Sequence, residues 1–398
     1  MQLRRLGIAV GALVALSGAT GCTNTLMDTA MSGAVRPVAP TGQPTDVHYD
    51  LLAGDLHCHV SPPDGEWHVS RNLADTVKLA AEEKLDFVVL TPHVWARFFA
   101  VEELRERVLG EQARLRAQVA ALPPGPTLFV PGFEYTDGQY GHVGVAFADL
   151  EKILSDLPTA LLAEHPEIFF QRHVAAGGVL TVNHPSTTPI PFFLSIARAD
   201  LSWRPFTAPG GLFPAEIQAI HQLAQAFEVY NLTTSELRDR FLLGDREQSI
   251  HTVFDYLDHE TLKQHRPLTA VGGSDSHSHH LRATTFVLSD QGRTIEGVRQ
   301  ALVAGRTCVR DPAACSFRAR SPGGAWVPVG GAIEGASRVE LWAAGGEVQI
   351  YRDSAVVASP PESRVTQLDV PSTCSVLRAH VGKGYSSSIY VNCGFKVN

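Results

Sequence analysis

Two short segments of the sequence place metal-binding side chains two residues apart. GDLHCHVSPPDG carries His57 and His59, and GGSDSH carries Asp275 and His277. Side chains alternate between the two faces of a β-strand, so residues two apart point in the same direction. Imidazole and carboxylate groups gathered in this way suit divalent ions such as zinc, iron or manganese. The two segments therefore predict chemistry that depends on a metal.

Further apolar runs end on, or lead into, residues of the same kind. VVLTPH ends on His93, VPGFE on Glu134 and VLTVNHP on His184, while GQYGHVGVAF contains His142. Asp64 lies in a Pro- and Gly-rich loop just after the first histidine pair, where it can fold back over the strand ends. A single histidine of this kind is usually an ordinary core or surface residue. The repetition at separate strand ends is what predicts one shared site.

Two acidic residues beside these segments are candidate catalytic residues. Asp55 shares the strand face of His57, so we expect it to orient a ligand imidazole, the alternative being a solvated residue near the strand end. Glu228, in EVYN, ends another strand and is expected to face the same mouth, beside the metal or the substrate. Asn231 fits either this site or a turn. Cys58 points to the opposite face and is predicted to be a core residue.

The remaining histidines fall into two groups. His68, His279 and His280 lie near the expected mouth of the site and are candidate substrate contacts. The others occupy helical or loop stretches without a strand-end pattern and are predicted to be ordinary: His165, His173, His221, His251, His259 and His265.

The elements that must position these residues follow from the pattern of the chain. From residue 50 to about 310, short apolar runs alternate with amphipathic segments such as 72–85 and 101–122. This alternation predicts an α/β fold with a largely parallel sheet or barrel, whose strands are covered on both faces. Residues 316–398 contain only short alternating runs, which predict a small antiparallel β domain. Polar groups at the C-terminal ends of strands then meet where such folds place their sites.

The first residues have the features of an export signal. Arg4 and Arg5 precede an apolar segment, and small residues lead to Cys22. This pattern is similar to a bacterial lipoprotein signal over residues 1–22, although ordinary cleavage after a small residue remains open. Residues 23–47 are rich in Thr, Pro and Gly and are predicted to be a flexible tether. We therefore expect a periplasmic or cell-surface protein, lipid-anchored through Cys22.

Cysteine spacing and charge narrow the possibilities further. Four cysteines lie beyond residue 305, and an exported chain can form the disulfides Cys308–Cys315 and Cys374–Cys393, although other pairings or free buried thiols remain open. The net charge of −8 argues against non-specific binding to nucleic acid, so we expect none.

Taken in order, DLHCHVSPPDG, TPH, GFEYTDGQYGHVGVAF, TVNHP and GGSDSH resemble the PHP (polymerase and histidinol phosphatase) superfamily of metallo-phosphoesterases. EVYN, the helix ending in AGR, the following CVRDP and the β-rich tail are similar to its CehA/McbA subgroup. The resemblance covers residues 50–312 well and the tail loosely. It implies a distorted TIM-like (β/α)7 barrel over residues 48–312, followed by a β-sandwich-like accessory domain over 313–398.

The resemblance also implies a ligand set for two or three divalent ions, with Glu134 as the bridging carboxylate. The implied metal ligands are His57, His59, Asp64, His93, Glu134, His142, His184, Asp275 and His277. One position departs from the family pattern, because Pro92 in TPH replaces the usual aspartate. That change affects a hydrogen bond or proton relay beside the metals, and with it the rate or substrate range.

The predicted function is hydrolysis by metal-activated water, most simply of a phosphomonoester or phosphodiester. No Ser–His–Asp motif or phosphate-binding Gly-rich loop offers another route. The expected partner is a small anionic phosphate ester. Two alternatives remain: hydrolysis of a non-phosphate ester such as a carbamate, and a surface-anchored binding module with structural metals.

Overall fold

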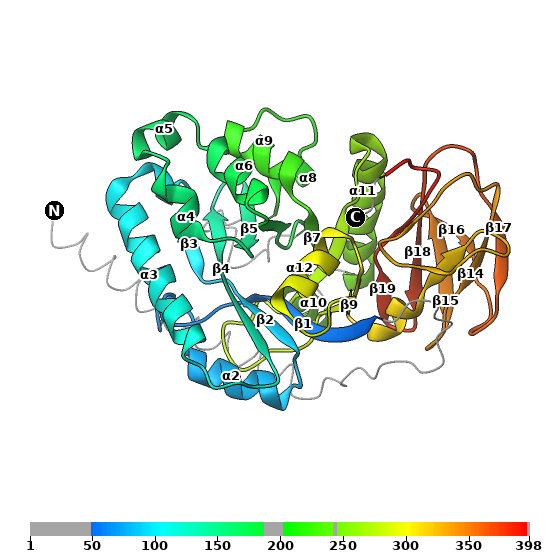
Figure 1. The fold of residues 1–398 in the computed structure, drawn as a ribbon, viewed down its shortest axis with the longest axis horizontal. Coiled ribbons are helices and arrows are strands. Elements are labelled where there is room, and N and C mark those ends of the chain that lie inside the picture. Colours follow the sequence, from blue (N-terminus) through cyan, green and yellow to red (C-terminus); the bar gives the residue numbers. More distant parts are fainter. Residues whose placement is uncertain (1–48, 187–201, 242–244, 396–398) are drawn as a thin grey trace.

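The computed structural model describes residues 49–186, 202–241 and 245–395, with side chains omitted for 237–241 (Figure 1). The predicted signal and the predicted tether therefore lie outside the described residues. Within the described part of the chain, no helix combines the length and apolar character needed to cross a membrane.

The α/β part of the molecule is built on one large mixed sheet. Its strands are β1 (Asp50–Cys58), β2 (Phe87–Leu90), β3 (His93–Trp95), β4 (Leu128–Asp137), β5 (Gly141–Ala146), β6 (Val179–Val182), β7 (Ala226–Asn231), β8 (Thr269–Gly273), β9 (Thr285–Ser289) and β10 (Thr307–Val309). Strands such as β2 and β7 are buried throughout, because helices and other strands cover both faces of their apolar runs.

The pairing of these strands only partly matches the predicted barrel. β1–β2–β4 and β6–β7–β8 pair in parallel, whereas β5 runs antiparallel to both β4 and β6. β9 pairs antiparallel with β1, and β10 continues the sheet beyond it. An isolated parallel bridge joins Cys58 to Ser276, just after β8. A mixed α/β fold with many parallel strands is therefore present, while a closed (β/α)7 barrel is not confirmed.

Helices flank this sheet, and polar caps fix where several of them begin. Asn72, Asp245 and Thr294 each accept a hydrogen bond from a backbone N–H in the first turn of the helix that follows. The helical elements are α2 (Leu73–Glu82), η1 (Phe98–Ala100), α3 (Glu102–Ala120), α4 (Leu150–Ser155), α5 (Thr159–Glu164), α6 (Glu167–Ala175), α8 (Arg204–Thr207), α9 (Ala215–Leu223), α10 (Leu232–Phe241), α11 (Arg246–Gln264), α12 (Ile295–Val303) and η2 (Pro312–Ser316).

The C-terminal region is made of short strands, as predicted, but its strands are not separate from the large sheet. β10 pairs with β19, and β18 and β20 continue the same sheet, while β12–β11–β14–β17 form a second sheet. α11 lies between this region and the α/β part (Figure 1). The strands are β11 (Arg318–Arg320), β12 (Val327–Pro328), β13 (Ala332–Ile333), β14 (Arg338–Trp342), β15 (Val348–Arg352), β16 (Ala355–Ala358), β17 (Thr366–Asp369), β18 (Ser375–Val381), β19 (Gly384–Ser386) and β20 (Ile389–Val391).

Both predicted disulfides are present in the C-terminal part of the structure. Cys308 bonds to Cys315, and Cys374 bonds to Cys393. Cys58 is a free, fully buried thiol that packs in an apolar cluster with Val60. The predictions of these two pairings and of a core role for Cys58 are therefore confirmed.

Candidate metal centre

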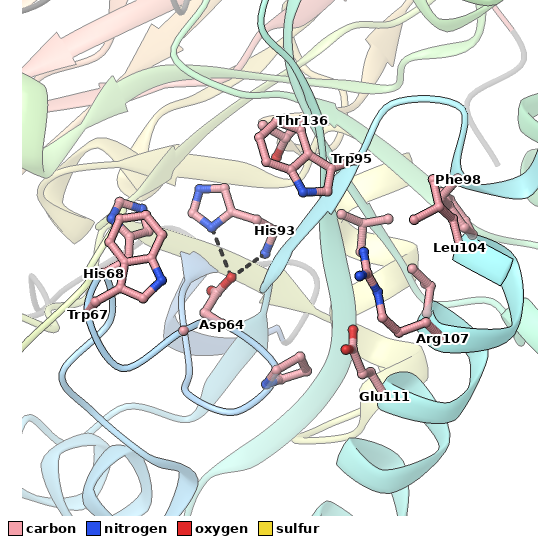
Figure 2. Close-up of a pocket in the computed structure, with 14 residues that line it drawn as sticks. Asp64, Trp67, His68, His93, Trp95, Phe98, Leu104, Arg107, Glu111 and Thr136 are labelled. Carbon is pink, nitrogen blue, oxygen red and sulfur yellow. Dashed lines mark hydrogen bonds and ion pairs between the residues drawn. The ribbon is translucent and has the colours of Figure 1, made fainter. Parts of the chain in front are cut away.

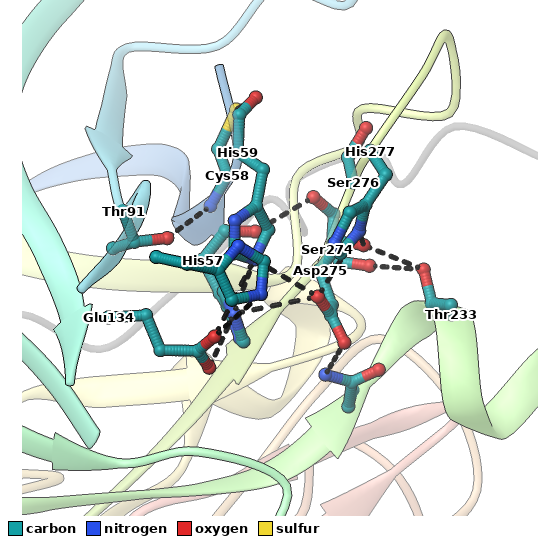
Figure 3. Close-up of polar contacts among 12 residues, drawn as sticks. His57, Cys58, His59, Thr91, Glu134, Thr233, Ser274, Asp275, Ser276 and His277 are labelled. Atoms are coloured by element: carbon teal, nitrogen blue, oxygen red, sulfur yellow. Dashed lines mark hydrogen bonds and ion pairs between the residues drawn. The ribbon is translucent and has the colours of Figure 1, made fainter. Parts of the chain in front are cut away.

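Backbone hydrogen bonds align the two segments that carry the closely spaced side chains. The Asp275 N–H donates to the His57 carbonyl at 2.8 Å, and the His59 N–H donates to the Ser276 carbonyl at 3.1 Å. These bonds fix the end of β1 beside the residues that follow β8. His57, His59 and Asp275 consequently point toward one another, with Glu134 facing them (Figure 3).

Glu134 lies at the centre of the arrangement. Its side chain is buried, and its two oxygens face imidazole nitrogens from four different strands or strand ends. The nitrogens and their distances are His57 Nε2 at 3.1 Å, His142 Nδ1 at 3.3 Å, His93 Nε2 at 3.4 Å, His184 Nε2 at 3.5 Å and His59 Nε2 at 3.9 Å. One carboxylate with this many neighbours has the position expected of a group shared between ions.

Asp275 holds the other side of the same space. Its Oδ1 lies 3.3 Å from His59 Nε2, 3.5 Å from His57 Nε2 and 3.5 Å from His277 Nδ1. His57 Nε2 and His59 Nε2 are themselves only 3.1 Å apart. The nitrogen and oxygen atoms that could bind a metal therefore face one another, rather than the positive charge of a lysine or arginine side chain among the described residues.

The donor atoms form four groups of three, and within each group all donors lie within 4.8 Å of one another. The groups are His57–His59–Glu134, His57–His184–Asp275, Glu134–His142–His184 and His59–His93–His277. We call these eight residues the strand-end cluster. Mixed imidazole and carboxylate donors at this spacing fit zinc, iron or manganese, so the residues present suit the predicted ions.

Asp64, the ninth predicted ligand, belongs to none of these groups and lies behind two of the imidazoles. Its Oδ2 is 3.1 Å from His59 Nδ1, and its Oδ1 is 3.1 Å from His93 Nδ1. Oδ1 also accepts a hydrogen bond from the His93 backbone N–H at 2.9 Å. In this arrangement Asp64 orients the rings of His59 and His93, whose Nε2 atoms face Glu134. Its own coordination of an ion stays a prediction.

The two candidate catalytic acids divide their roles differently from the sequence prediction. Glu228, not Asp55, contacts a ligand imidazole: its Oε1 is 3.2 Å from His57 Nδ1, and its Oε2 accepts from the His184 backbone N–H at 2.6 Å. Asp55 instead accepts hydrogen bonds from the backbone N–H and hydroxyl of Ser274 and from the Thr284 hydroxyl. Asp55 therefore secures the loop after β8.

Three residues that sequence reasoning did not select, or treated as ambiguous, support the cluster. Asn183 donates from Nδ2 to Glu134 Oε1 at 2.8 Å, and Asn231 donates from Nδ2 to Glu228 Oε2 at 3.0 Å. The fully buried Arg71 guanidinium donates to the His59 carbonyl, to the Ser276 hydroxyl and carbonyl, and to the Ser278 carbonyl. Asn183 could have been found from its place beside His184, whereas Arg71 lies in a loop with no distinguishing pattern.

The position that departs from the family pattern contributes through its backbone. The Pro92 carbonyl accepts a hydrogen bond from the Glu134 N–H at 2.9 Å. The carboxylate beside His93 comes from Asp64 on another loop. The TPH sequence thus keeps a carboxylate next to this histidine without the aspartate expected before it.

Electrostatics indicate that the central carboxylate of Glu134 is ionised. Burial alone would raise the pKa of Glu134, but the imidazoles of His142 and His57 hold that pKa well below its usual range. Burial opposes charge on His59 as well, yet Asp275 and Asp64 raise its pKa to about 9. The cluster therefore favours bound cations, either protons on its imidazoles or metal ions that displace them.

A cavity of about 370 Å³ opens beside the cluster (Figure 2). Asp64, His93 and His68 line it, together with Trp67 and Trp95. The prediction that His68 lies near the mouth agrees with this position, since its ring is 4.5 Å from that of His277.

The other histidines lie outside the cluster. His280 is buried and contacts the Thr233 and Ser278 hydroxyls, His279 is exposed, and neither lines this cavity. His173 contacts the Val179 carbonyl in the core.

Comparison with known proteins gives weak similarity only. No protein-family model matches the chain, and no curated protein matches its sequence. Three solved structures are similar in part: PsfC from Pseudomonas syringae (19% identity, 60% of this chain and 81% of PsfC, TM-score 0.33), the lesion-specific endonuclease PfuEndoQ from Pyrococcus furiosus (12%, 70% and 64%, 0.37) and a candidate metal-dependent phosphoesterase from Bifidobacterium adolescentis (14%, 66% and 97%, 0.28).

This level of similarity is too low to assign an activity to the chain. The chain spans less than two thirds of PfuEndoQ, whose name marks it as an endonuclease. The exclusion of nucleic acid that the net charge suggested therefore has no support from these proteins.

Proposed function

We propose that this protein is a PHP-type metal-dependent hydrolase, similar to the CehA/McbA subgroup, that cleaves phosphate monoesters or diesters. The observation that carries this proposal is the set of imidazoles from separate strand ends around the buried carboxylate of Glu134, at the mouth of a cavity. Purely structural metal sites are closed and rarely need so many donors. A cavity of this size suits a small-molecule substrate.

The residues that would hold two or three divalent ions are those of the strand-end cluster, with Asp64 at its edge. Ions bound there would lower the pKa of a coordinated water toward neutrality and polarise an oxygen of the substrate. Hydrolysis would break the bond between phosphorus and the ester oxygen, with water supplying a hydroxyl to phosphorus and a proton to the departing alcohol.

The protein's own groups prepare the imidazoles for this role. A carboxylate oxygen accepts hydrogen bonds, so the contact between Glu228 Oε1 and His57 Nδ1 places a ring proton on Nδ1. In the same way, the contacts of Asp64 with His59 Nδ1 and His93 Nδ1 place a ring proton on Nδ1 of each histidine. When each ring is neutral, Nε2 then keeps its lone pair directed at the centre of the cluster, which is the state a metal ligand needs. Asn183 and the Pro92 carbonyl fix the side chain and backbone of Glu134.

The second candidate function is hydrolysis of a non-phosphate ester such as a carbamate. The cavity supports this alternative, because Arg107 is the one lysine or arginine among the described residues that line it, which also include Asp64 and Glu111. A doubly charged phosphate ester would gain little from such a lining beyond the ions themselves.

Metal analysis combined with hydrolysis of 4-nitrophenyl phosphate, bis(4-nitrophenyl) phosphate and phenyl carbamate tests these functions. We expect two or three ions per chain, turnover of a phosphate ester, and loss of both on His57→Ala. His165→Ala is the matched control, because this exposed histidine pairs with Glu167 near the surface, away from the cluster. Turnover of the carbamate alone selects the second function. Bound metal without any turnover points to the binding module, and failure of divalent ions to bind contradicts the whole proposal.

We also propose export, with lipid attachment at Cys22. The two disulfides support an oxidising compartment, since such bonds persist outside the cytosol. Fractionation of cells that express the full chain, with Cys22→Ser as the comparison, tests the anchor. The native protein should partition with membranes and the variant should not.

A further inference from the structure

Two tryptophans stand at the rim of the cavity beside the strand-end cluster. Trp67 is 70% exposed and Trp95 is 67% exposed, and both line this one cavity. In Figure 2 they lie on opposite sides of His93. Tryptophan is normally among the more buried side chains, so two indoles open to solvent around one hollow mark a contact surface for a ligand.

The backbone places each indole for a reason. Trp95 ends β3, two residues after His93, so strand alternation puts the two on the same face. Trp67 lies on the loop that follows Asp64, and its indole occupies the space next to Gly65. A Cβ built on Gly65 would lie 2.5 Å from Trp67 Nε1, so the glycine permits this position of the ring.

Aromatic rings continue from the rim toward the cluster. The Trp67 ring lies 5.2 Å from that of His68, and the His68 ring lies 5.1 Å from that of His93. Flat faces at such spacing favour a planar ligand, because aromatic groups stack in offset or edge-to-face arrangements at these distances. The volume of about 370 Å³ accommodates one small molecule carrying a ring.

The charges around the cavity favour a small ligand over a nucleic-acid strand. Single-strand binders align several cations along the backbone, whereas Arg107 on α3 is the one Lys or Arg that the described part of the chain contributes to this lining. Arg107 has no ion-pair partner within 4.0 Å among the described residues, and it shares the lining with Glu111 and Asp64. The single cation of Arg107 can pair with one anionic substituent but cannot neutralise the successive phosphates of a nucleic-acid strand.

We infer that the cavity between Trp67 and Trp95 is a subsite for the planar aromatic substituent of an ester whose scissile group meets the strand-end cluster at His93. This inference rests on the proposed hydrolase function and adds a substrate class to it. Stacking on the two indoles would bind the ring, and the ester group would then lie at the ligand imidazole that opens into the cavity.

Binding of phosphonates, which resist hydrolysis, tests the subsite with the full-length protein. Calorimetry with the manganese-loaded protein compares phenylphosphonate, cyclohexylphosphonate and methylphosphonate, so that planarity is separated from apolar size. We expect the phenyl compound to bind tightest. Trp67→Ala and Trp95→Ala should each weaken its binding by about 2- to 12-fold, as for a lost aromatic pair, and leave methylphosphonate unaffected.

A second measurement needs no metal. Saturation-transfer NMR of the chelator-treated protein should show contact with benzyl alcohol in preference to cyclohexylmethanol, and each tryptophan variant should reduce this preference. Val356→Ala is the control, because Val356 is an exposed apolar residue on β16 that does not line the cavity. Gly65→Ala should act like a mild Trp67 variant, since the added methyl displaces the indole.

The results separate the subsite from the proposed function. Equal binding of phenyl- and cyclohexylphosphonate, or a phenyl preference that survives both tryptophan variants, overturns the subsite while leaving His57-dependent hydrolysis intact. A tryptophan-dependent preference in the metal-free protein without any ester hydrolysis supports the subsite and overturns the hydrolase. Tighter tryptophan-dependent binding of a thymidine oligonucleotide than of phenylphosphonate would replace the small ester with nucleic acid.

Discussion

Two regions of the molecule bury charged side chains, and they do so in opposite ways. Between α11 and β18, Arg378 and Asp258 are both about 2% exposed, and Arg378 Nε lies 2.9 Å from Asp258 Oδ2. Ser354 adds a backbone N–H and a hydroxyl to the same carboxylate. In the strand-end cluster no lysine or arginine of the described residues pairs with Glu134 or Asp275, and imidazoles surround them instead.

The difference shows how a structural charge cluster is told from a ligand site. Asp258 faces a fixed counter-charge, and the Arg378 guanidinium also stacks over Phe254 at 4.5 Å, so the charge of the carboxylate is already paired within the chain. In the cluster, donor atoms of His57 and His59 face each other at 3.1 Å, so their lone pairs need a proton or a cation between them. Four experiments test this contrast.

The largest effect is expected from breaking the self-contained pair. Arg378→Met leaves Asp258 buried without its cation and should lower the free energy of unfolding by about 3–5 kcal/mol, as measured by urea denaturation. Arg338→Met, which removes an exposed partner of Asp369, should leave the urea midpoint unchanged. Metal content per folded molecule should not change in either variant. Loss of metal in Arg378→Met would show that the two regions are not independent.

Metal loading should stabilise the protein through the strand-end cluster and not through the Arg378–Asp258 pair. Manganese at about 100 times its dissociation constant should raise the free energy of unfolding by about 2.7 kcal/mol, because it binds only the folded chain. A chelator should reverse the increase, and Glu134→Gln should abolish it by removing the central charge. The same increase in Glu134→Gln would contradict the assignment of this carboxylate.

A smaller effect is expected from the groups that orient the ligands. Glu228→Gln should weaken manganese binding by about tenfold, the lower end for partners behind a ligand, because glutamine still accepts from His57 Nδ1 but lacks the charge. Asp55→Asn should affect thermal stability more than affinity, since Asp55 holds Ser274 and contacts no ligand ring. Calorimetric titration of both variants with manganese tests whether Glu228, and not Asp55, orients a metal ligand. Equal losses of manganese affinity in the two variants would reject this difference in role.

The smallest effect on stability depends on pH and comes from Glu247 on α11. Burial would raise the pKa of Glu247, but the Tyr385 hydroxyl and the Arg310 guanidinium lower it from 4.5 to about 2. A carboxylate with a lowered folded-state pKa stabilises the protein fully above about pH 4.5 and progressively less as the pH falls toward 2. Glu247→Gln should therefore cost about 0.2–1 kcal/mol at pH 7, as expected for a partly exposed pair.

Melting temperatures of native protein and Glu247→Gln at several pH values check this sign. The gap between the two should stay constant above pH 5 and narrow below pH 4.5. Glu82→Gln, an exposed carboxylate of α2, serves as the control. A gap that widens on acidification would show that Glu247 is not ionised in the folded protein.

Sequence reasoning located the candidate site well because its signal is local. His57, His59, Asp275 and His277 were selected by two-residue spacing at strand ends, and the structure brings them together. The disulfides were equally local, since each joins cysteines close in sequence. The candidate site could therefore be predicted mainly from the two-residue alternation of side chains along strands and from the position of these residues at strand ends.

The parts that could not be predicted depend on contacts across the chain. Asp55 contacts Ser274 and Thr284 instead of a ligand ring, and this long-range contact leaves no pattern in the sequence. Arg71 stabilises two loops through its buried guanidinium, yet a lone arginine between loop residues resembles a solvated one. Likewise, no local feature announces that β10 will pair with β19.

That last pairing bears on how the molecule can be divided. β10 is the strand at which the α/β part would end, and β19, from much later in the sequence, covers its outer edge. Cutting the chain at the predicted boundary after residue 312 would leave β10, with the sequence Thr-Cys-Val, paired with β9 on one side and exposed along its other edge, and such edges recruit other chains. The C-terminal strands thus cover an edge that would otherwise be open to pairing with other chains, and a shortened protein should be judged first by its solubility.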